Sequence, residues 1–346
     1  MNSQSNNSTS NIRRYILDGF TFAFLTLVVL SVIFNPTEEQ QLNLSQNAII
    51  FFVAYFVGAL ISRFMNAKGI KTLGEYLFEP SYKKALETKP MFKSFWGWHL
   101  TGLLVLLFIV GLFKTKFSVI ELLNEDGFNG AKRLFAGIAS PNWQILPRAV
   151  LNIIETIFMA FMATALAIPF AFFLSFASAK NIMTGKLFWI YLTMRTIFNV
   201  TRSIEALLWA IIFSVWVGIG PFAGMLALMI HSIASLSKQY SEMVETVNEG
   251  PIEGVQSCGA NKLQTIWFAI VPQVVLPYIS FTVYRWDINV RMATIIGLVG
   301  GGGIGTMLIQ YQGQAMWSEV GTIIVVIAAV VWIMDQASAY IREALK

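Results

Sequence analysis

The chain has 346 residues, of which 56% are hydrophobic and only 12% are charged. A soluble domain usually carries about a quarter charged residues, so most of this chain is expected to lie in lipid. The net charge of +5 comes from basic residues in short segments between apolar runs, which points to membrane topology and not to a nucleic-acid partner. One cysteine and two histidines exclude an internal disulfide and leave no metal-ligand spacing.

The apolar runs predict an all-α polytopic membrane protein with about eight transmembrane helices. Residues 1–14 are expected to form a disordered cytoplasmic tail. Three spans follow within residues 15–113, and residues 114–148 are expected to be a periplasmic segment before five further spans. The predicted spans lie near residues 15–34, 47–65, 98–113, 149–177, 187–217, 222–236, 263–284 and 320–340.

The distribution of lysine and arginine predicts which side of the membrane each link faces. Residues 63–93 are rich in lysine and are assigned to the cytoplasm, whereas the link that contains Glu38 and Glu39 carries no lysine or arginine and is expected to face outward. Basic residues also flank the first and last spans, at Arg14 and Arg342. Both termini are therefore expected to be cytoplasmic.

The segment between the sixth and seventh predicted spans has strong local signals for a short helix. Pro251 fits the first position of a helix, where its missing N–H would be unpaired anyway, and Glu253 in the first turn favours the helix dipole. We expect Gly250 to end the preceding helix and Gly259 to close the short one in the left-handed conformation. The pattern predicts a two-turn helix at 251–258.

The residues after this short helix, and one of its faces, predict where the next helix begins and what the short helix contacts. Asn261 and Gln264 have the spacing of a capping box, which predicts the start of the next helix. Ile252 and Val255 lie three apart and share a face that two turns cannot bury alone. This face either lies in a groove of another subunit or packs on the membrane helices of the same chain.

At this point the residues resemble a known family. The loop is similar to the cytoplasmic signature loop of ABC-importer permeases, in which Glu-Ala-Ala is followed by a glycine and later by an apolar-Pro pair. The matching positions are Glu253, Gly254, Val255, Gly259, Val271 and Pro272. The two alanines of the pattern are replaced here. Over about residues 130–346 the chain is similar to phosphonate importer permeases, relatives of the methionine-type permeases, in the segments RSIEALLWAIIF, VGIGPFAGMLALMIHSIASLSKQYSE and ATIIGLVGGGGIG.

The resemblance implies a fold and a set of partners. Residues 149–346 would hold a five-helix type I ABC-importer permease core, with a coupling loop at 241–263 that docks into a groove of an ATPase. The permease would form a homodimer in contact with membrane lipid in a bacterial inner membrane, with two separate ATPase subunits and a periplasmic substrate-binding protein. The docking residues would be Pro251, Ile252, Glu253, Gly254, Val255 and Gly259.

The resemblance also implies a cargo. It is expected to be a phosphonate or a related phosphorus oxyanion such as phosphite or phosphate, and the alternative is a small amino acid such as methionine. ATP and Mg would be bound by the ATPase, so this chain is expected to hold no cofactor and to be no enzyme. A membrane oxidoreductase and a sensor or scaffold protein are the other classes of function considered.

Charged residues within or beside the predicted spans are candidates for an anion pathway. A charge at mid-membrane costs about 2.5–3.5 kcal/mol and therefore usually faces a bundle interior. Arg202 and Glu205 lie three apart, so on a helix they could form an internal ion pair with a structural role. The alternative is that Arg202 lines the anion pathway. Arg285 and Arg291 follow the seventh predicted span and either line the pathway or mark its outer edge. His231 is expected to be a hydrogen-bonded core residue.

The segment GLVGGGGIG at 297–305 formally contains a dinucleotide-binding fingerprint. This enzyme hypothesis fails because about forty residues follow, most of them in one apolar span, whereas a Rossmann site needs further strands and helices. No Walker A pattern occurs. We expect the glycines to allow close helix approach or a bend at the pathway, the alternative being a plain outer loop. The pathway candidates are Gly297, Gly300, Gly301, Gly302, Gly303 and Gly305.

Overall fold

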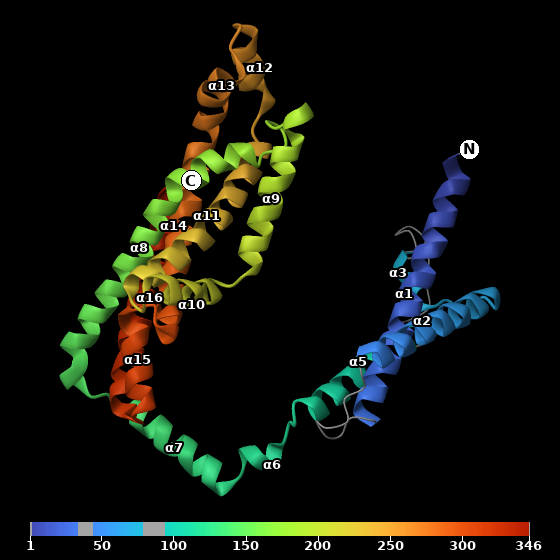
Figure 1. The fold of residues 1–346 in the computed structure, drawn as a ribbon, viewed down its shortest axis with the longest axis horizontal. Helices are drawn as coiled ribbons and strands as arrows, with labels where there is room; N and C mark the ends of the chain where they lie inside the picture. The colour runs from blue at the N-terminus through green and yellow to red at the C-terminus, as the bar shows by residue number, and fades with distance from the viewer. Residues whose placement is uncertain (1, 34–43, 79–93, 346) are drawn as a thin grey trace. The chain divides into compact units, whose positions relative to one another are not determined.

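The computed structural model describes residues 2–33, 44–78 and 94–345, and within these ranges it contains helices and no strand (Figure 1). The predicted outward link with Glu38 and Glu39, and the lysines of 83–93, lie outside the described residues. The chain divides into two compact units, Met1–Asn124 and Glu125–Lys346.

The first unit is a small helical cluster. Its core holds Asp18, which is buried and accepts hydrogen bonds from Ser62 Oγ and from the Gly74 N–H at 2.7 Å. This carboxylate joins the first two helices to the short third one. Gly19 lies against the Tyr55 backbone, and a Cβ there would come within 2.9 Å of its carbonyl oxygen, so these two helices pack closely. The described helices are α1 (Asn2–Ile33), α2 (Leu44–Ala67), α3 (Leu73–Phe78), α5 (Phe95–Lys114) and α6 (Val119–Leu122).

The second unit holds the longer helices. Its helices are α7 (Glu125–Ala139), α8 (Leu146–Ala177), α9 (Phe188–Ser203), α10 (Ala206–Val217), α11 (Pro221–Glu245), α12 (Glu249–Ser257), α13 (Lys262–Thr265), α14 (Val271–Ile296), α15 (Gly303–Gly313) and α16 (Trp317–Ala344). Short turns occupy Trp143–Ile145, Gly185–Leu187 and Gly297–Val299, and a π-helical turn at Ile266–Ile270 leads into α14.

Small residues form the centre of the second unit, where α8, α11 and α14 pack together. Small side chains let membrane helices approach closely. The buried alanines include Ala160, Ala163, Ala167 and Ala171 on α8 and Ala223 and Ala227 on α11. Large apolar side chains such as Phe173 and Trp216 are exposed instead, at 70% and 76%, which suits a surface in contact with lipid.

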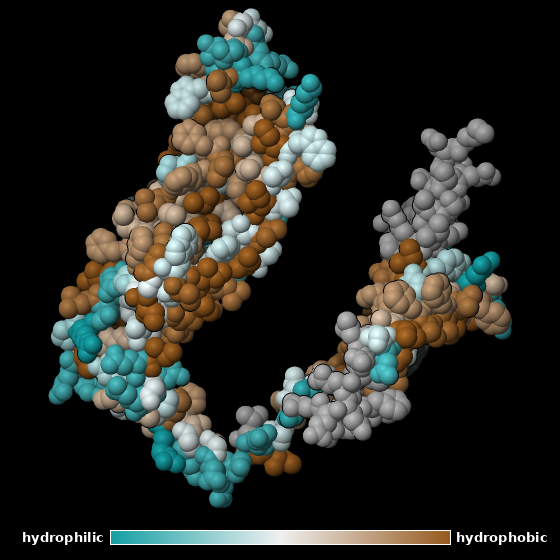
Figure 2. Space-filling model, viewed as in Figure 1, coloured by the Kyte–Doolittle hydropathy of each residue, from teal (hydrophilic) through white to brown (hydrophobic). Residues whose placement is uncertain are grey.

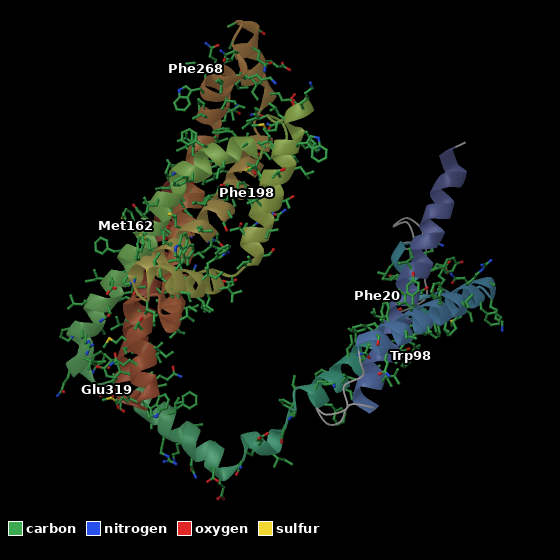
Figure 3. The ribbon with its side chains drawn as sticks, viewed as in Figure 1. Phe20, Trp98, Met162, Phe198, Phe268 and Glu319 are labelled. Carbon is green, nitrogen blue, oxygen red and sulfur yellow. The ribbon has the colours of Figure 1, made fainter. Side chains whose placement is uncertain are left out.

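The hydropathy of the surface of the second unit changes along its length. Figure 2 shows apolar residues over its body and hydrophilic residues at the end formed by α12 and at the opposite end near α7. In Figure 3, Phe268 and Glu319 lie toward these two ends, with Met162 and Phe198 between them. An apolar belt between two polar ends is the distribution expected of a membrane-spanning bundle.

The number of spans is smaller in the described residues than the eight predicted. Five helical stretches are long and apolar enough to cross a membrane, and a sixth is formed if α9 and α10 count as one bent span. The predicted spans near 15–34 and 222–236 fall in α1 and α11, which are helical but are not among these. The prediction of an all-α polytopic membrane protein is confirmed, whereas the count of eight stays a prediction.

Three boundaries differ from the prediction. Helix α1 begins at Asn2, so the expected disordered tail is helical, since no glycine or proline interrupts the chain before the span. The predicted span 187–217 is two helices bent by 87°, because Ile204 and Glu205 have extended backbones. The predicted span 263–284 continues to Ile296.

Candidate functional site

The predicted short helix in the loop is confirmed as α12, Glu249–Ser257. Gly250 lies inside α12, so the prediction that Gly250 ends the preceding helix is wrong. The break falls earlier because α11 ends at Glu245 and Asn248 is extended, with φ −68° and ψ 135°. Gly259 has a φ of 83°, which confirms the left-handed end.

The capping box after α12 is also confirmed. The Asn261 N–H donates to Gln264 Oε1 at 2.8 Å, and the Gln264 N–H donates to Asn261 Oδ1 at 2.9 Å. These bonds satisfy donors that the first turn of a helix leaves unpaired. The short helix is therefore bounded at both ends by defined backbone geometry, as a stiff element requires.

The two faces of α12 differ in what covers them. Ile252 packs against the buried cluster that includes Tyr240, Val244 and Ile270, so the alternative in which this side chain packs on the chain's own helices is the one observed. On the outer face, Gly250 and Gly254 are exposed, and a Cβ added to either would have no heavy atom within 4 Å. The outward face is smooth and open to the approach of another chain.

The beginning of α12 is clamped to α14. The Asn248 N–H donates to Gln273 Oε1 at 3.0 Å, and Gln273 Nε2 donates to the Asn248 carbonyl at 3.4 Å. Gln273 Nε2 also donates to the Ala269 carbonyl at 2.8 Å. One side chain therefore joins the loop backbone to the start of a membrane-spanning helix.

The last turn of α11 is joined to α9 by an ion pair. Arg195 NH1 donates to Glu245 Oε1 at 2.8 Å, and its NH2 group lies 3.4 Å from Glu242. The Lys180 N–H, in the link between α8 and α9, donates to Glu245 Oε1 at 2.8 Å. Glu245 thus connects three segments just before α12. The sequence gave no sign of this pair.

The glycine run is tightly packed, which contradicts the alternative of a plain outer loop. A Cβ at Gly303 would lie 2.3 Å from Thr156 Oγ1 of α8, and one at Gly302 would lie 2.6 Å from Pro221 of α11. Both glycines have positive φ, at 68° and 79°, where residues with side chains are strained. Among the other members of the run, Gly297 lies against Gly305, Gly301 against Gly224, and Gly300 O accepts from the Gly220 N–H at 2.9 Å. The run is therefore a rigid joint between helices.

The predicted pathway charges are not brought together as a pair. Arg202 lies in the last turn of α9 and Glu205 at the start of α10, and no ion pair joins them in the part of the chain that the structure describes. The reason is the bend between the two helices. Arg291 instead pairs with Asp287 at 2.8 Å and with Asp335 at 2.9 Å, which links α14 to α16.

A polar stripe on α14 was not identified from the sequence. It consists of Tyr278, Thr282, Arg285 and Asn289, whose spacings of four, three and four residues place them on one face of a helix. Their partners lie on α8 and α11, and the described hydrogen bonds are Tyr278 with Ser175, Thr282 with Tyr240, Arg285 with Ser232, and Asn289 with Thr164 and Ser232. The spacing was the available signal, but the predicted span stopped at residue 284 and cut the stripe in two.

Comparison with known proteins identifies the family. The family described as binding-protein-dependent transport system inner membrane component matches residues 171–341, which include α12 and the glycine run. The phosphite transport system permease protein of Stutzerimonas stutzeri is 34% identical over 194 residues, which cover 56% of this chain and 70% of that protein. The chain belongs to this family. It is accordingly a multi-pass permease component of a transport system.

Other relatives of the permease carry related names. A putative cryptic phosphonate transport system permease protein of Escherichia coli (strain K12) is 41% identical over 119 residues, which cover 34% of this chain and 98% of that protein. A phosphate-import permease protein of Mycolicibacterium smegmatis is 30% identical over 61% of this chain and 40% of that protein. Among solved structures, the methionine ABC transporter in inward-facing conformations matches with a TM-score of 0.50 and 22% identity, over 59% of this chain and 99% of that chain. This last likeness shows the fold alone.

Proposed function

We propose that this permease moves a phosphorus oxyanion, such as phosphite, a phosphonate or phosphate, across the bacterial inner membrane. The observation that carries the proposal is the 34% identity to a phosphite transport permease over 70% of that protein's length. Relatives named for phosphonate and for phosphate support the same class of cargo. The structural likeness to a methionine transporter concerns the fold, so it gives the amino-acid alternative no comparable support.

We propose further that α12 is the contact for a separate ATPase, which binds ATP and Mg. Its outward face, with Gly250 and Gly254, leaves room for a partner surface, while Ile252 anchors it inward. The hydrogen bonds of Gln273 connect the start of α12 to α14. The ion pair of Glu245 connects the end of α11, just before α12, to α9. A displacement of α12 would move these helices as rigid bodies, which is how small shifts at a contact become changes in a gate.

The remaining partners and the orientation follow from the same proposal. Two copies of the permease enclose one pathway, which the glycine run and Arg202 line, and a periplasmic binding protein delivers the cargo. The α12 end and both termini face the cytoplasm, and the end near α7 faces the periplasm. The clustering of lysine in residues 63–93 supports this orientation.

The proposal is tested by transport in proteoliposomes that contain the permease with its ATPase, supplied with the binding protein and ATP. We expect ATP-dependent uptake of radiolabelled phosphite or methylphosphonate that methionine does not compete for. Uptake of methionine with none of phosphite, methylphosphonate or phosphate would contradict the proposed cargo.

A further inference from the structure

Arg285 is a buried cation in the centre of the second unit. It is 6% exposed and lies within the apolar stretch Lys262–Val299 that is long enough to span a membrane. Its Nε group donates to Ser232 Oγ at 3.1 Å, and its NH2 group contacts His231 Nδ1. The hydroxyl carries no charge, and a ring nitrogen that accepts from a guanidinium belongs to a neutral imidazole.

The charged neighbours of Arg285 differ from those of Arg291 on the same helix. Among the residues that the structure describes, no ion pair within 4.0 Å includes Arg285. Arg291, six residues further along the same helix, shows the opposite arrangement, with two carboxylates on one guanidinium. A buried arginine without a carboxylate in direct contact is costly in a membrane, so Arg285 is suited to bind an anion that is not part of the chain.

The surroundings of Arg285 include the elbow between α9 and α10, residues 203–206. Arg202 and Glu205, on the two sides of the elbow, lie close enough to act electrostatically on Arg285, and the His231 ring is within hydrogen-bonding reach of the Arg202 backbone. Two guanidinium groups and one carboxylate leave an excess of one positive charge. Two arginines and a histidine therefore lie near one another where a membrane helix is broken.

The elbow also presents hydrogen-bond donors. Helix α10 begins at Ala206 with no side-chain cap. The N–H groups of Leu208 and Trp209 donate to the Glu205 carbonyl at 3.0 and 3.4 Å, so the donors without a helical partner in this turn are the N–H groups of Ala206 and Leu207. Trp209, in that same turn, has a buried Nε1 group for which the described residues offer no hydrogen-bond partner. Broken membrane helices that point their N-termini at anionic groups are a known way of building binding sites at membrane depth.

From this arrangement we infer that Arg285, supported by His231 and Arg202 at the elbow of α9 and α10, binds the phosphorus oxyanion as it crosses the membrane. The inference rests on the proposed function for its cargo and adds the site that contacts it. The planar guanidinium of Arg285 can donate two parallel hydrogen bonds to a tetrahedral oxyanion. Ser232 and His231 hold that guanidinium in place and so position it before the anion arrives.

The test compares Arg285→Gln, Arg285→Lys and the wild type in the complete permease–ATPase complex in nanodiscs. Arg133→Gln, which removes an exposed arginine from α7, is the matched control. The first measurement is the rise in melting temperature caused by millimolar phosphite, with chloride at equal ionic strength as the reference. A ligand that binds the native state raises stability by mass action. The ATPase subunits are identical in all variants, so any stabilisation through them is common to all.

We expect phosphite to stabilise the wild type and Arg133→Gln equally, Arg285→Lys less, and Arg285→Gln no more than chloride does. In ATP-dependent uptake, Arg285→Gln should lose about tenfold or more relative to wild type, because at least one charge-assisted hydrogen bond to the oxyanion is removed. An equal phosphite-dependent rise in Arg285→Gln and wild type would overturn the inference. A third outcome separates the two proposals. If phosphite raised the melting temperature only when Arg285 is present, but the complex transported no phosphorus oxyanion, the binding site would be supported and the proposed function contradicted.

Discussion

Gln273 Oε1 accepts a hydrogen bond of 3.0 Å from the Asn248 N–H, across the gap between the start of α14 and the start of α12. The same amide donates to the Ala269 carbonyl at 2.8 Å, so its orientation is fixed from both ends. Since Asn248 directly precedes α12, a displacement of that helix is passed to α14 through one side chain.

Gln273→Ala should uncouple the loop from the membrane helices without preventing assembly. A neutral hydrogen bond contributes about 0.5–1.5 kcal/mol, so we expect phosphite transported per ATP hydrolysed to fall about two- to tenfold. The measurement is parallel uptake and phosphate release in proteoliposomes. Gln310→Ala on the exposed side of α15 is the control. An unchanged ratio in Gln273→Ala would show that this amide does not transmit the movement.

Gly254→Leu should block the docking of the ATPase while leaving the permease itself intact. A Cβ added there meets no heavy atom within 4 Å among the described residues, and replacing a helical glycine favours the helix by about 0.5–1 kcal/mol. We expect normal membrane yield and melting temperature but loss of ATPase from the purified complex, measured by quantitative gel densitometry. Gly259→Leu is a poor substitute because its positive φ adds strain. Full retention of the ATPase would argue against this face as the contact.

The ion pair between Arg195 and Glu245 should show measurable coupling in a double-mutant cycle. Its side chains are 21% and 25% exposed, so solvent screening limits the coupling energy to about 1 kcal/mol. We expect Arg195→Gln and Glu245→Gln each to lower the stability of the permease, and the double variant to be little worse than either. Strictly additive losses in urea-dependent unfolding would mean that the contact contributes nothing.

Gly303→Ala should destabilise the permease, because the added Cβ meets Thr156 Oγ1 and the backbone has a φ of 68°. A strained backbone of this kind costs about 1–3 kcal/mol. We expect a lower melting temperature in nanodiscs, with Gly313→Ala as the control, since nothing lies within 4 Å of a Cβ there. Equal melting temperatures for the two variants would contradict the description of the run as a rigid joint.

Local signals predicted the parts of the structure that depend on neighbouring residues. The left-handed Gly259 and the capping box of Asn261 and Gln264 lie where the sequence placed them, because each is decided by backbone geometry over a few positions. The helix around Pro251 was found for the same reason. The predicted start of this helix was wrong because Gly250 was taken as a helix end. A short exposed helix tolerates a glycine at a cost of about 1 kcal/mol.

Features that depend on tertiary contacts were not predictable from the sequence. No glycine or proline lies between residues 187 and 217, so no local sequence signal predicts the bend before Ala206. The partners of Arg291, Asp287 and Asp335, come from one turn earlier on α14 and from another helix, and the sequence gave no reason to join the three. Arg285 was placed at the edge of a span because hydropathy alone ended the helix too early.

The most direct test of the account uses Cys258, the single cysteine of the chain, which is exposed and follows α12. A membrane-impermeant maleimide is applied to right-side-out and to inside-out vesicles, with and without the bound ATPase. We expect labelling only in inside-out vesicles and protection when the ATPase is present. Labelling in right-side-out vesicles would place α12 on the periplasmic side, out of reach of any cytoplasmic ATPase.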